Sequence, residues 1–468
     1  MSFASPVFLF CLPGVVLASW LLHRRVRLQN LFLLAFSLLF YAWWDWRFLG
    51  LLAATVLVDY AVGLRIAAAP SPRARRGWLG LGLAFGLLTL GFFKYFDFFA
   101  GSLQALLTSL GFKASLPVLG LILPMGLSFY TFRAFSYLID VYRGKMPPVR
   151  SLLDYALYET FFPQLVAGPI ERAHNLLPQL RASKRPSREQ WRRGGYLLLY
   201  GLFQKVAVGD AAGTLADIAL HHAYGGWITV LAGTLAFTIQ IYGDFAGYSN
   251  IARGCACLLG VELMVNFRTP YFSASVTEFW HRWHISLSTF LRDYLYIPLG
   301  GNRLGEARGT LNLMVVMLLG GLWHGANWTF VLWGGLHGLY LAVHKWLLRH
   351  RPPPRRDPRL RGLAKCCGTF ALVSLTWLFF RDPTVADAWR HLRILATLQD
   401  GAWSPNTLIE LGVIAAFLVP LDWLAHARGT DTSPLDWPWW LRGPLYACFI
   451  ASIYGGIGGR HPFLYYQF

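Results

Sequence analysis

The sequence has little charge. Of its 468 residues only 14% are Asp, Glu, Lys or Arg, whereas 55% are hydrophobic and the mean hydropathy is +0.43. Since soluble chains carry about 25% charged residues, this composition excludes an ordinary soluble domain. Apolar runs recur along the whole length, and a membrane-spanning helix needs about 20 mostly apolar residues. We therefore predict an all-α, polytopic membrane protein.

Acidic residues are scarcer than basic ones, 23 against 42, which leaves a net charge of +19. A basic balance can indicate nucleic-acid binding. Here the cations form short patches between apolar runs, which is typical of cytoplasmic loops and of contact with anionic lipid. The densest patches, residues 172–193 and 349–365, are predicted to be cytoplasmic, and no nucleic-acid partner is expected.

Cysteine is also rare. The six cysteines form no CxxC pair, so neither a zinc site nor a disulfide framework is indicated. A metal site built from His281, His284 and His324 is conceivable, but no carboxylate or cysteine stands at a firm ligand spacing. The first residues have no basic region before the apolar run, which favours a retained helix over a removed signal peptide.

Thirteen apolar segments qualify as spans or parts of spans, and no fixed-period repeat separates them into domains, so we expect one membrane-embedded domain over residues 1–468. If the basic loops share one side, segment 152–168 must enter and leave on that side, which makes it a re-entrant candidate. The segments are 6–22, 30–46, 49–67, 78–99, 117–139, 152–168, 194–209, 228–246, 311–322, 327–348, 363–380, 408–425 and 441–457.

Residues 278–338 differ from the other apolar segments, because they carry several ionisable side chains. Such groups at membrane depth mark a pathway or a reacting centre. Within residues 270–305 we predict an amphipathic or partly buried helix that ends in the turn around Gly300 and Gly301. His281 and His284, three residues apart, would share one face of that helix.

His324 lies in the string WHGAN, between two apolar segments. A histidine there is a natural general base, because its ordinary pKa of about 6.5 is close to working pH. Gly320, Gly321 and Gly325 allow backbone or substrate to approach closely. The alternative is a structural histidine, hydrogen-bonded inside a helix junction.

His284 is the second candidate. Trp280 and Trp283 would desolvate it and disfavour its charged form, so that it could polarise a carbonyl or orient a hydroxyl. The alternative is an interfacial histidine beside an aromatic belt. His281 is weaker, because the charges around it indicate a solvated patch.

Asp244 follows Tyr242 at the end of another apolar run. A carboxylate in that setting must be paired or hydrated. It could hold a histidine or a backbone bend, or it could be a polar helix cap at the membrane edge.

Several strings together resemble the membrane-bound O-acyltransferase family, in particular its bacterial polysaccharide-acetylating branch. They are FWHRWHISLSTFLRDYLYIPLGGNR, LLGGLWHGANWTFVLWGGLHG, IYGDFAGYSNIARG, YAWWDWRFL, LPMGLSFYTFRAFSYLIDVYRG, FFPQLVAGPIER and HPFLYYQF. The resemblance extends over essentially the whole chain.

The resemblance implies a ring of tilted transmembrane and re-entrant helices around a central funnel. It implies His324 as the catalytic residue and His284 as its companion. His281 stands where relatives commonly carry Arg or Asn, which argues against a required role for it. The residues expected to line the funnel are Trp323, Asn327, Asp244, Tyr242, Arg292 and Asp293.

The resemblance also implies the substrates and partners. The donor would be acetyl-CoA or a similar acyl thioester from the cytoplasm, with no bound cofactor. The acetyl group would move towards an extracytoplasmic polysaccharide, alginate-like for preference, with help from a separate hydrolase-like protein at the bacterial inner membrane. A histidine in a dry, glycine-rich junction suits such chemistry, because acyl transfer to oxygen needs a base and shelter from water.

Two other functions fit the residues. A transporter or flippase would also use inward-facing ionisable groups and broken helices, although it has no need for the paired tryptophan–histidine motifs. A non-catalytic assembly subunit would tolerate loss of both histidines.

Overall fold

The fold is described from a computed structural model of the chain, for residues 2–113, 115–166, 168–221, 225–350, 359–456 and 463–464. These residues form helices and loops, and their only strand-like pairing is an isolated bridge between Gly225 and Ala402. Within them, five helical stretches are long and apolar enough to cross a membrane: residues 26–68, 72–109, 227–258, 360–381 and 405–428. The prediction of an all-α, polytopic membrane protein is confirmed.

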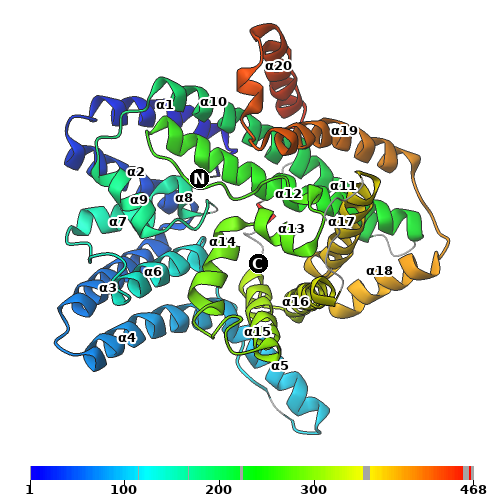
Figure 1. Cartoon of the computed structure of the whole chain (residues 1–468), viewed down its shortest axis with the longest axis horizontal. Helices are drawn as coiled ribbons and strands as arrows, with labels where there is room; N and C mark the ends of the chain where they lie inside the picture. The colour runs from blue at the N-terminus through cyan, green and yellow to red at the C-terminus, as the bar shows by residue number, and fades with distance from the viewer. Residues whose placement is uncertain are drawn as a thin grey trace. The chain divides into compact units, whose positions relative to one another are not determined.

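Two compact units divide the chain. Unit 1 consists of residues 1–190 and 255–263, and unit 2 of residues 191–254 and 264–468. The α-helices that begin in unit 1 are labelled in Figure 1, and all its helices are α1 (Pro6–Leu21), α2 (Val26–Asp45), η1 (Trp46–Phe48), α3 (Leu49–Ala68), α4 (Pro72–Leu90), η2 (Gly91–Tyr95), α5 (Phe96–Ser109), α6 (Leu127–Tyr142), α7 (Leu152–Thr160), α8 (Phe162–Leu165), α9 (Ala173–Arg181) and α10 (Arg188–Leu202).

One predicted span of unit 1 is wrong. Segment 117–139 is not a single helix: its first ten residues lack regular structure, and α6 begins only at Leu127. Gly126 precedes that helix with a φ of 74°, a left-handed conformation that glycine adopts without steric cost. Asp97 holds the preceding loop by accepting hydrogen bonds from the backbone of Leu119 and Gly120 at 2.7 and 3.0 Å.

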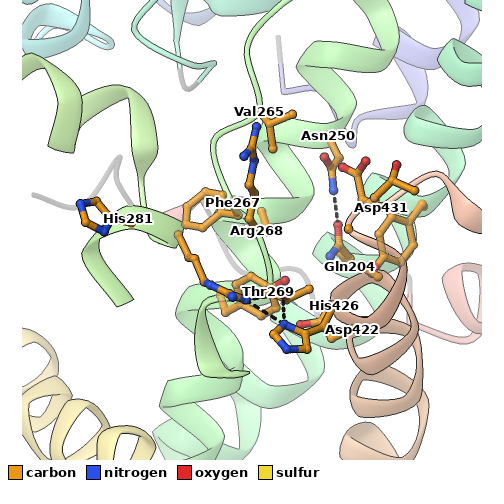
Figure 2. A pocket seen from close by; sticks show the side chains of 17 residues that line it. Gln204, Asn250, Val265, Phe267, Arg268, Thr269, His281, Asp422, His426 and Asp431 are labelled. Atoms are coloured by element: carbon orange, nitrogen blue, oxygen red, sulfur yellow. Dashed lines mark hydrogen bonds between the residues drawn. The ribbon is translucent and has the colours of Figure 1, made fainter. Parts of the chain in front are cut away.

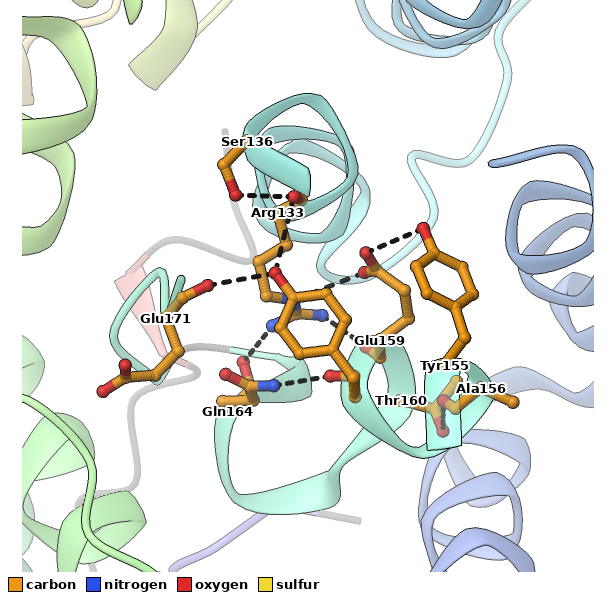
Figure 3. A network of polar contacts seen from close by, with 9 residues as sticks. Arg133, Ser136, Tyr155, Ala156, Glu159, Thr160, Gln164 and Glu171 are labelled. Atoms are coloured by element: carbon orange, nitrogen blue, oxygen red, sulfur yellow. Dashed lines mark hydrogen bonds and ion pairs between the residues drawn. The ribbon is translucent and has the colours of Figure 1, made fainter. Parts of the chain in front are cut away.

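Segment 152–168, the re-entrant candidate, is broken into α7 and the single turn α8. The break leaves carbonyl groups outside a helical ladder, and buried carbonyls need partners. Arg133, fully buried on α6, donates to the carbonyl oxygens of Glu159 and Gln164 at 2.6 and 2.9 Å, and its Nε lies 3.5 Å from the Glu159 carboxylate (Figure 3). A buried arginine therefore holds the non-helical bend.

The remaining helices belong to unit 2: η3 (Phe203–Asp210), α11 (Ala211–His221), α12 (Trp227–Leu258), η4 (Pro270–Phe272), α13 (Val276–Arg282), α14 (Ile285–Leu291), η5 (Arg292–Tyr296), α15 (Glu306–His324), α16 (Trp328–His350), α17 (Arg359–Arg381), α18 (Val385–Thr397), α19 (Pro405–Arg428), η6 (Ser433–Asp436) and α20 (Trp439–Gly455). The last residues of α12 and the first of α10 fall in unit 1.

Glycines set two close helix contacts in unit 2. A methyl group at Gly247 of α12 would lie 2.7 Å from the backbone nitrogen of Lys205 on η3. A methyl group at Gly321 of α15 would overlap the Phe330 carbonyl oxygen on α16. Small residues thus let both helix pairs approach backbone to backbone, and the antiparallel pair of α15 and α16 carries one of the predicted histidines at its turn.

The two ends of unit 2 are marked by separate polar contacts. At one end Arg253 pairs with Asp431, and Arg192 lies 3.7 Å from Asp436. At the other end Arg381 pairs with Asp217, and Asn327 Nδ2 donates to the Pro383 carbonyl oxygen at 2.9 Å. Arg381 lies 6.0 Å from the ring of Phe237 on α12, and Arg253 is 16 residues further along that helix, so the two ends are about 24 Å apart along its axis.

Candidate active site

The helix breaks at His284. Helix α13 ends at Arg282, and His284 takes a φ of 42° and a ψ of 54°, a left-handed conformation uncommon for a residue with a side chain. The expectation that His281 and His284 share a helical face is therefore wrong. His281 is exposed at the end of one helix, whereas His284 is turned into the protein before α14 begins.

His284 lies in an aromatic enclosure and has no exposed surface. Its ring centroid is 4.6 Å from that of Phe245 in an edge-on contact, 6.3 Å from Phe267 and 5.9 Å from Trp323. The residue lies between α13 and α14, outside the five long apolar helices. Burial lowers its pKa to about 3, so its imidazole is neutral at physiological pH.

His324 is the last residue of α15 and is 2% exposed. The rings of Trp323, Trp333 and Phe380 surround it, with centroids 5.1, 5.1 and 5.4 Å from its own. Its centroid lies 6.3 Å from that of His284. The fold thus brings together the two histidines singled out in the sequence, although 40 residues separate them along the chain.

Of the predicted lining residues, Trp323 lies at this centre and contacts both imidazoles. Asn327 directly precedes α16, and its side chain forms hydrogen bonds with backbone atoms. Its Oδ1 accepts from Thr329 N at 3.1 Å while its Nδ2 donates to Pro383. It therefore fixes the turn that follows His324.

Tyr242 lines a neighbouring cavity of about 330 Å³ (Figure 2). Phe267 belongs both to the wall of this cavity and to the aromatic contacts of His284. Arg282 also lines this cavity, and its Nη1 lies 2.8 Å from His426 Nδ1. The lining residues are Tyr200, Gln204, Tyr242, Ala246, Asn250, Val265, Phe267, Arg268, Thr269, His281, Arg282, Asp422, Ala425, His426, Gly429, Thr430 and Asp431.

Asp244 lies on α12 and is buried. It forms an ion pair with Lys205, which also lies 2.7 Å from Asp210. Its other oxygen accepts a hydrogen bond from the backbone of Leu464 at 2.7 Å. Of the three possibilities considered, the structure supports the one in which Asp244 holds backbone. Phe463, which precedes Leu464, packs against Tyr248 with ring centroids 4.1 Å apart.

Arg292 and Asp293 pair with each other at 2.8 Å on η5, with side chains 58% and 31% exposed. They follow His284 by about two helical turns, roughly 12 Å along α14. The structure thus leaves this predicted pair outside the aromatic enclosure. The helix does end in the expected glycine-rich turn, where Gly300 and Gly301 have φ values of 106° and 55°.

Sequence reasoning missed Asn266, Lys205 and Asp422. Asp422 is a carboxylate inside an apolar helix, a signal that could have marked it as a pathway residue. Asn266 follows a plain apolar stretch and nothing local distinguishes it. Within the described residues, no group of three or more His, Cys, Asp or Glu is placed to hold a metal ion.

Comparisons with known proteins extend this picture. Residues 148–380 match the membrane-bound O-acyltransferase family. The chain is 38% identical to the probable alginate O-acetylase AlgI of Pseudomonas putida over 497 residues, covering 100% of both chains. It is 42% identical to that of Pseudomonas aeruginosa, covering 87% of this chain and 77% of the relative. It is 36% identical to the peptidoglycan O-acetyltransferase of Helicobacter pylori, covering 85% and 80%.

Long apolar helices and a pair of buried histidines define a polytopic membrane protein with a candidate reaction centre. The chain belongs to the membrane-bound O-acyltransferase family, as its motifs suggested, and is therefore an O-acyltransferase.

Proposed function

We propose that this protein transfers an acetyl group from a thioester donor towards hydroxyl groups of an extracytoplasmic polysaccharide, alginate-like for preference. The observation that carries the proposal is the pair His284 and His324, buried together among aromatic rings. The names of the relatives support the acetyl group and the polysaccharide class.

The chemistry assigned to the pair is acyl transfer. His324 removes the proton of the acceptor hydroxyl while its oxygen attacks the thioester carbonyl, and the neutral His284 holds the acceptor or the carbonyl in place. The carbon–oxygen bond forms, the carbon–sulfur bond breaks, and the proton leaves with the thiol. Aromatic enclosure keeps out water, which would otherwise hydrolyse the acyl group.

The donor is proposed to enter through the cavity beside Tyr242. Its lining combines Arg268 and Arg282 with uncharged polar groups and with the carboxyl groups of Asp422 and Asp431. The two guanidinium groups suit the phosphates of acetyl-CoA. The cavity includes Asp431, which lies at the Arg253 end of unit 2. Asn327 and Pro383 lie at the other end, next to His324, and this separation supports transfer from one membrane face to the other.

A thiol-release assay tests the function. Purified protein with acetyl-CoA and a small soluble hydroxyl compound in place of the polymer should release free thiol, and a double variant with His284→Ala and His324→Ala should not. His337→Ala is the matched control, because His337 is equally buried but bonds Trp280 and Thr376 at 3.3 and 3.0 Å. Thiol release by the double variant at the control rate would reject the assignment.

Orientation has its own test. In a cysteine-free background, single cysteines in residues 172–193 and 349–365 should resist a membrane-impermeant reagent in intact cells, because basic loops stay cytoplasmic. Labelling of either loop would reverse the orientation. An extracytoplasmic partner is also proposed, so vesicles containing this protein and acetyl-CoA alone should not acetylate added polymer.

A further inference from the structure

Asn266 lies at the back of His284. It belongs to the extended segment between α12 and α13 and is 1% exposed. Its backbone carbonyl oxygen accepts from Ile285 N at 2.9 Å, and its side-chain Oδ1 lies 3.2 Å from His284 Nδ1. Both contacts fall where the chain passes through the left-handed conformation of His284.

The orientation of the Asn266 amide follows from its other partners. Oδ1 accepts from Ser286 N at 3.1 Å and from Ser286 Oγ at 2.9 Å, while Nδ2 donates to Ser249 Oγ at 3.3 Å. A backbone N–H can only donate, so the atom facing Ser286 must be the oxygen. The reversed amide would place an NH₂ group against that N–H.

An oxygen that can only accept requires a donor on the other side. His284 Nδ1 must therefore carry the proton, which leaves Nε2 with the lone pair. Ser286 Oγ is farther from Nδ1, at 3.4 Å, than from Asn266 Oδ1, so the amide is the nearer partner for both groups.

We propose that Asn266 is a positioning residue that fixes His284 as the Nδ1–H tautomer, so that Nε2 is the nitrogen that accepts a hydrogen bond from the acceptor hydroxyl. This inference rests on the proposed function of the histidine pair. Asn266 contacts neither substrate, but it determines which ring nitrogen of His284 faces the acceptor hydroxyl with a lone pair.

Replacing Asn266 by Asp and by Leu separates this role from packing. Asp keeps the accepting oxygen but adds a negative charge beside Nδ1, which favours imidazolium and raises the pKa of His284. The two donors of Ser286 would keep the new carboxylate ionised. Among the described contacts, His324 on α15 is the titratable side chain packed against His284. Phe245 of α12, Phe267 and Trp323 carry no charge.

The measurement is kcat/KM against pH for acetyl transfer by monodisperse protein. Asn266→Asp should move the acidic limb to higher pH by about one unit or more, with near-normal rates above it. Asn266→Leu should lower kcat roughly 10- to 100-fold at every pH, as loss of a residue that orients a histidine does in metal sites. Asn312→Leu is the control: Asn312 is as buried and bonds two carbonyl oxygens, so its loss should affect stability and leave the profile unmoved.

An acidic limb in Asn266→Asp identical to that of the wild type, with His284→Ala inactive, would overturn the inference and leave the proposed function standing. Full activity in His284→Ala would overturn the assignment of His284 and this inference with it. If Asn266→Leu yields no monodisperse protein, the pH dependence of kcat/KM in the isosteric Asn266→Asp variant tests the inference by itself.

Discussion

Two buried clusters in this protein carry polar side chains in very different surroundings. Around Arg133 in unit 1 the partners are oxygen atoms, two carbonyl groups and a carboxylate. Around His324 in unit 2 the neighbours are the rings of Trp323, Trp333 and Phe380. The first arrangement spreads a charge over fixed acceptors and holds a bend of the chain. The second keeps imidazoles in an apolar, water-poor enclosure where a substrate can meet them.

The difference teaches how to separate structure from chemistry at membrane depth. A buried ionisable group is a functional hypothesis until its partners are known. Arg133 has partners that the bend of α7 and α8 would otherwise leave without donors, so its burial is explained by the fold. His324 instead packs among aromatic rings at the end of α15, so the two clusters should respond differently to substitution.

The largest effect is expected at the histidine centre. His324→Ala should reduce acetyl transfer about 10²- to 10⁴-fold, the usual loss when general-base help is removed. The amount of detergent-stable, monodisperse protein should stay close to that of the wild type. Activity per unit of such protein is the quantity to measure, and a loss accounted for entirely by missing protein would make His324 a structural residue like Arg133.

The reverse pattern is expected in unit 1. Arg133→Met leaves the Glu159 carboxylate buried beside an apolar side chain, which should destabilise the fold by about 3–5 kcal/mol. Thermal unfolding in detergent measures this. Adding Glu159→Gln should recover part of the loss, because the stranded charge is removed. If Arg133→Met instead kept full stability and lost only activity, the contrast between the clusters would be wrong.

A smaller effect is expected at Asp244, which joins Lys205 to the backbone of Leu464. Asp244→Leu removes an acceptor from a buried N–H and should lower the free energy of unfolding by about 1–3 kcal/mol. Asp244→Asn keeps an accepting oxygen and should cost less. Equal losses in both variants, read from thermal unfolding, would show that the charge and not the backbone contact matters.

The smallest effect is expected at His281. Its side chain is exposed at the end of α13, so His281→Arg should change acetyl transfer by less than about twofold, as surface substitutions rarely perturb a fold. His284→Arg, three residues on, is the matched contrast and should abolish activity. A severe loss in His281→Arg would show that His281 itself contributes to the cavity beside Tyr242, the proposed route of the donor, which it also lines.

The sequence by itself determined the class of this protein, because low charge and repeated apolar runs allow little except membrane helices. It also singled out His284 and His324, since ionisable residues in an apolar stretch are costly and few in number. The helical periodicity of the sequence did not predict the break after Arg282. A helical pattern continues through residues 281–284, whereas tertiary contacts with Asn266 accompany the left-handed conformation of His284.

The partners of the polar residues were decided by tertiary structure alone. Asp244 and Lys205 are 39 residues apart, and Arg133 meets carbonyl groups about 30 residues further along the chain. A sequence states that a buried charge needs a partner but not which one, because the choice depends on how closely the helices approach. That approach was set by glycines such as Gly247 and Gly321, whose missing side chains let one backbone lie against another.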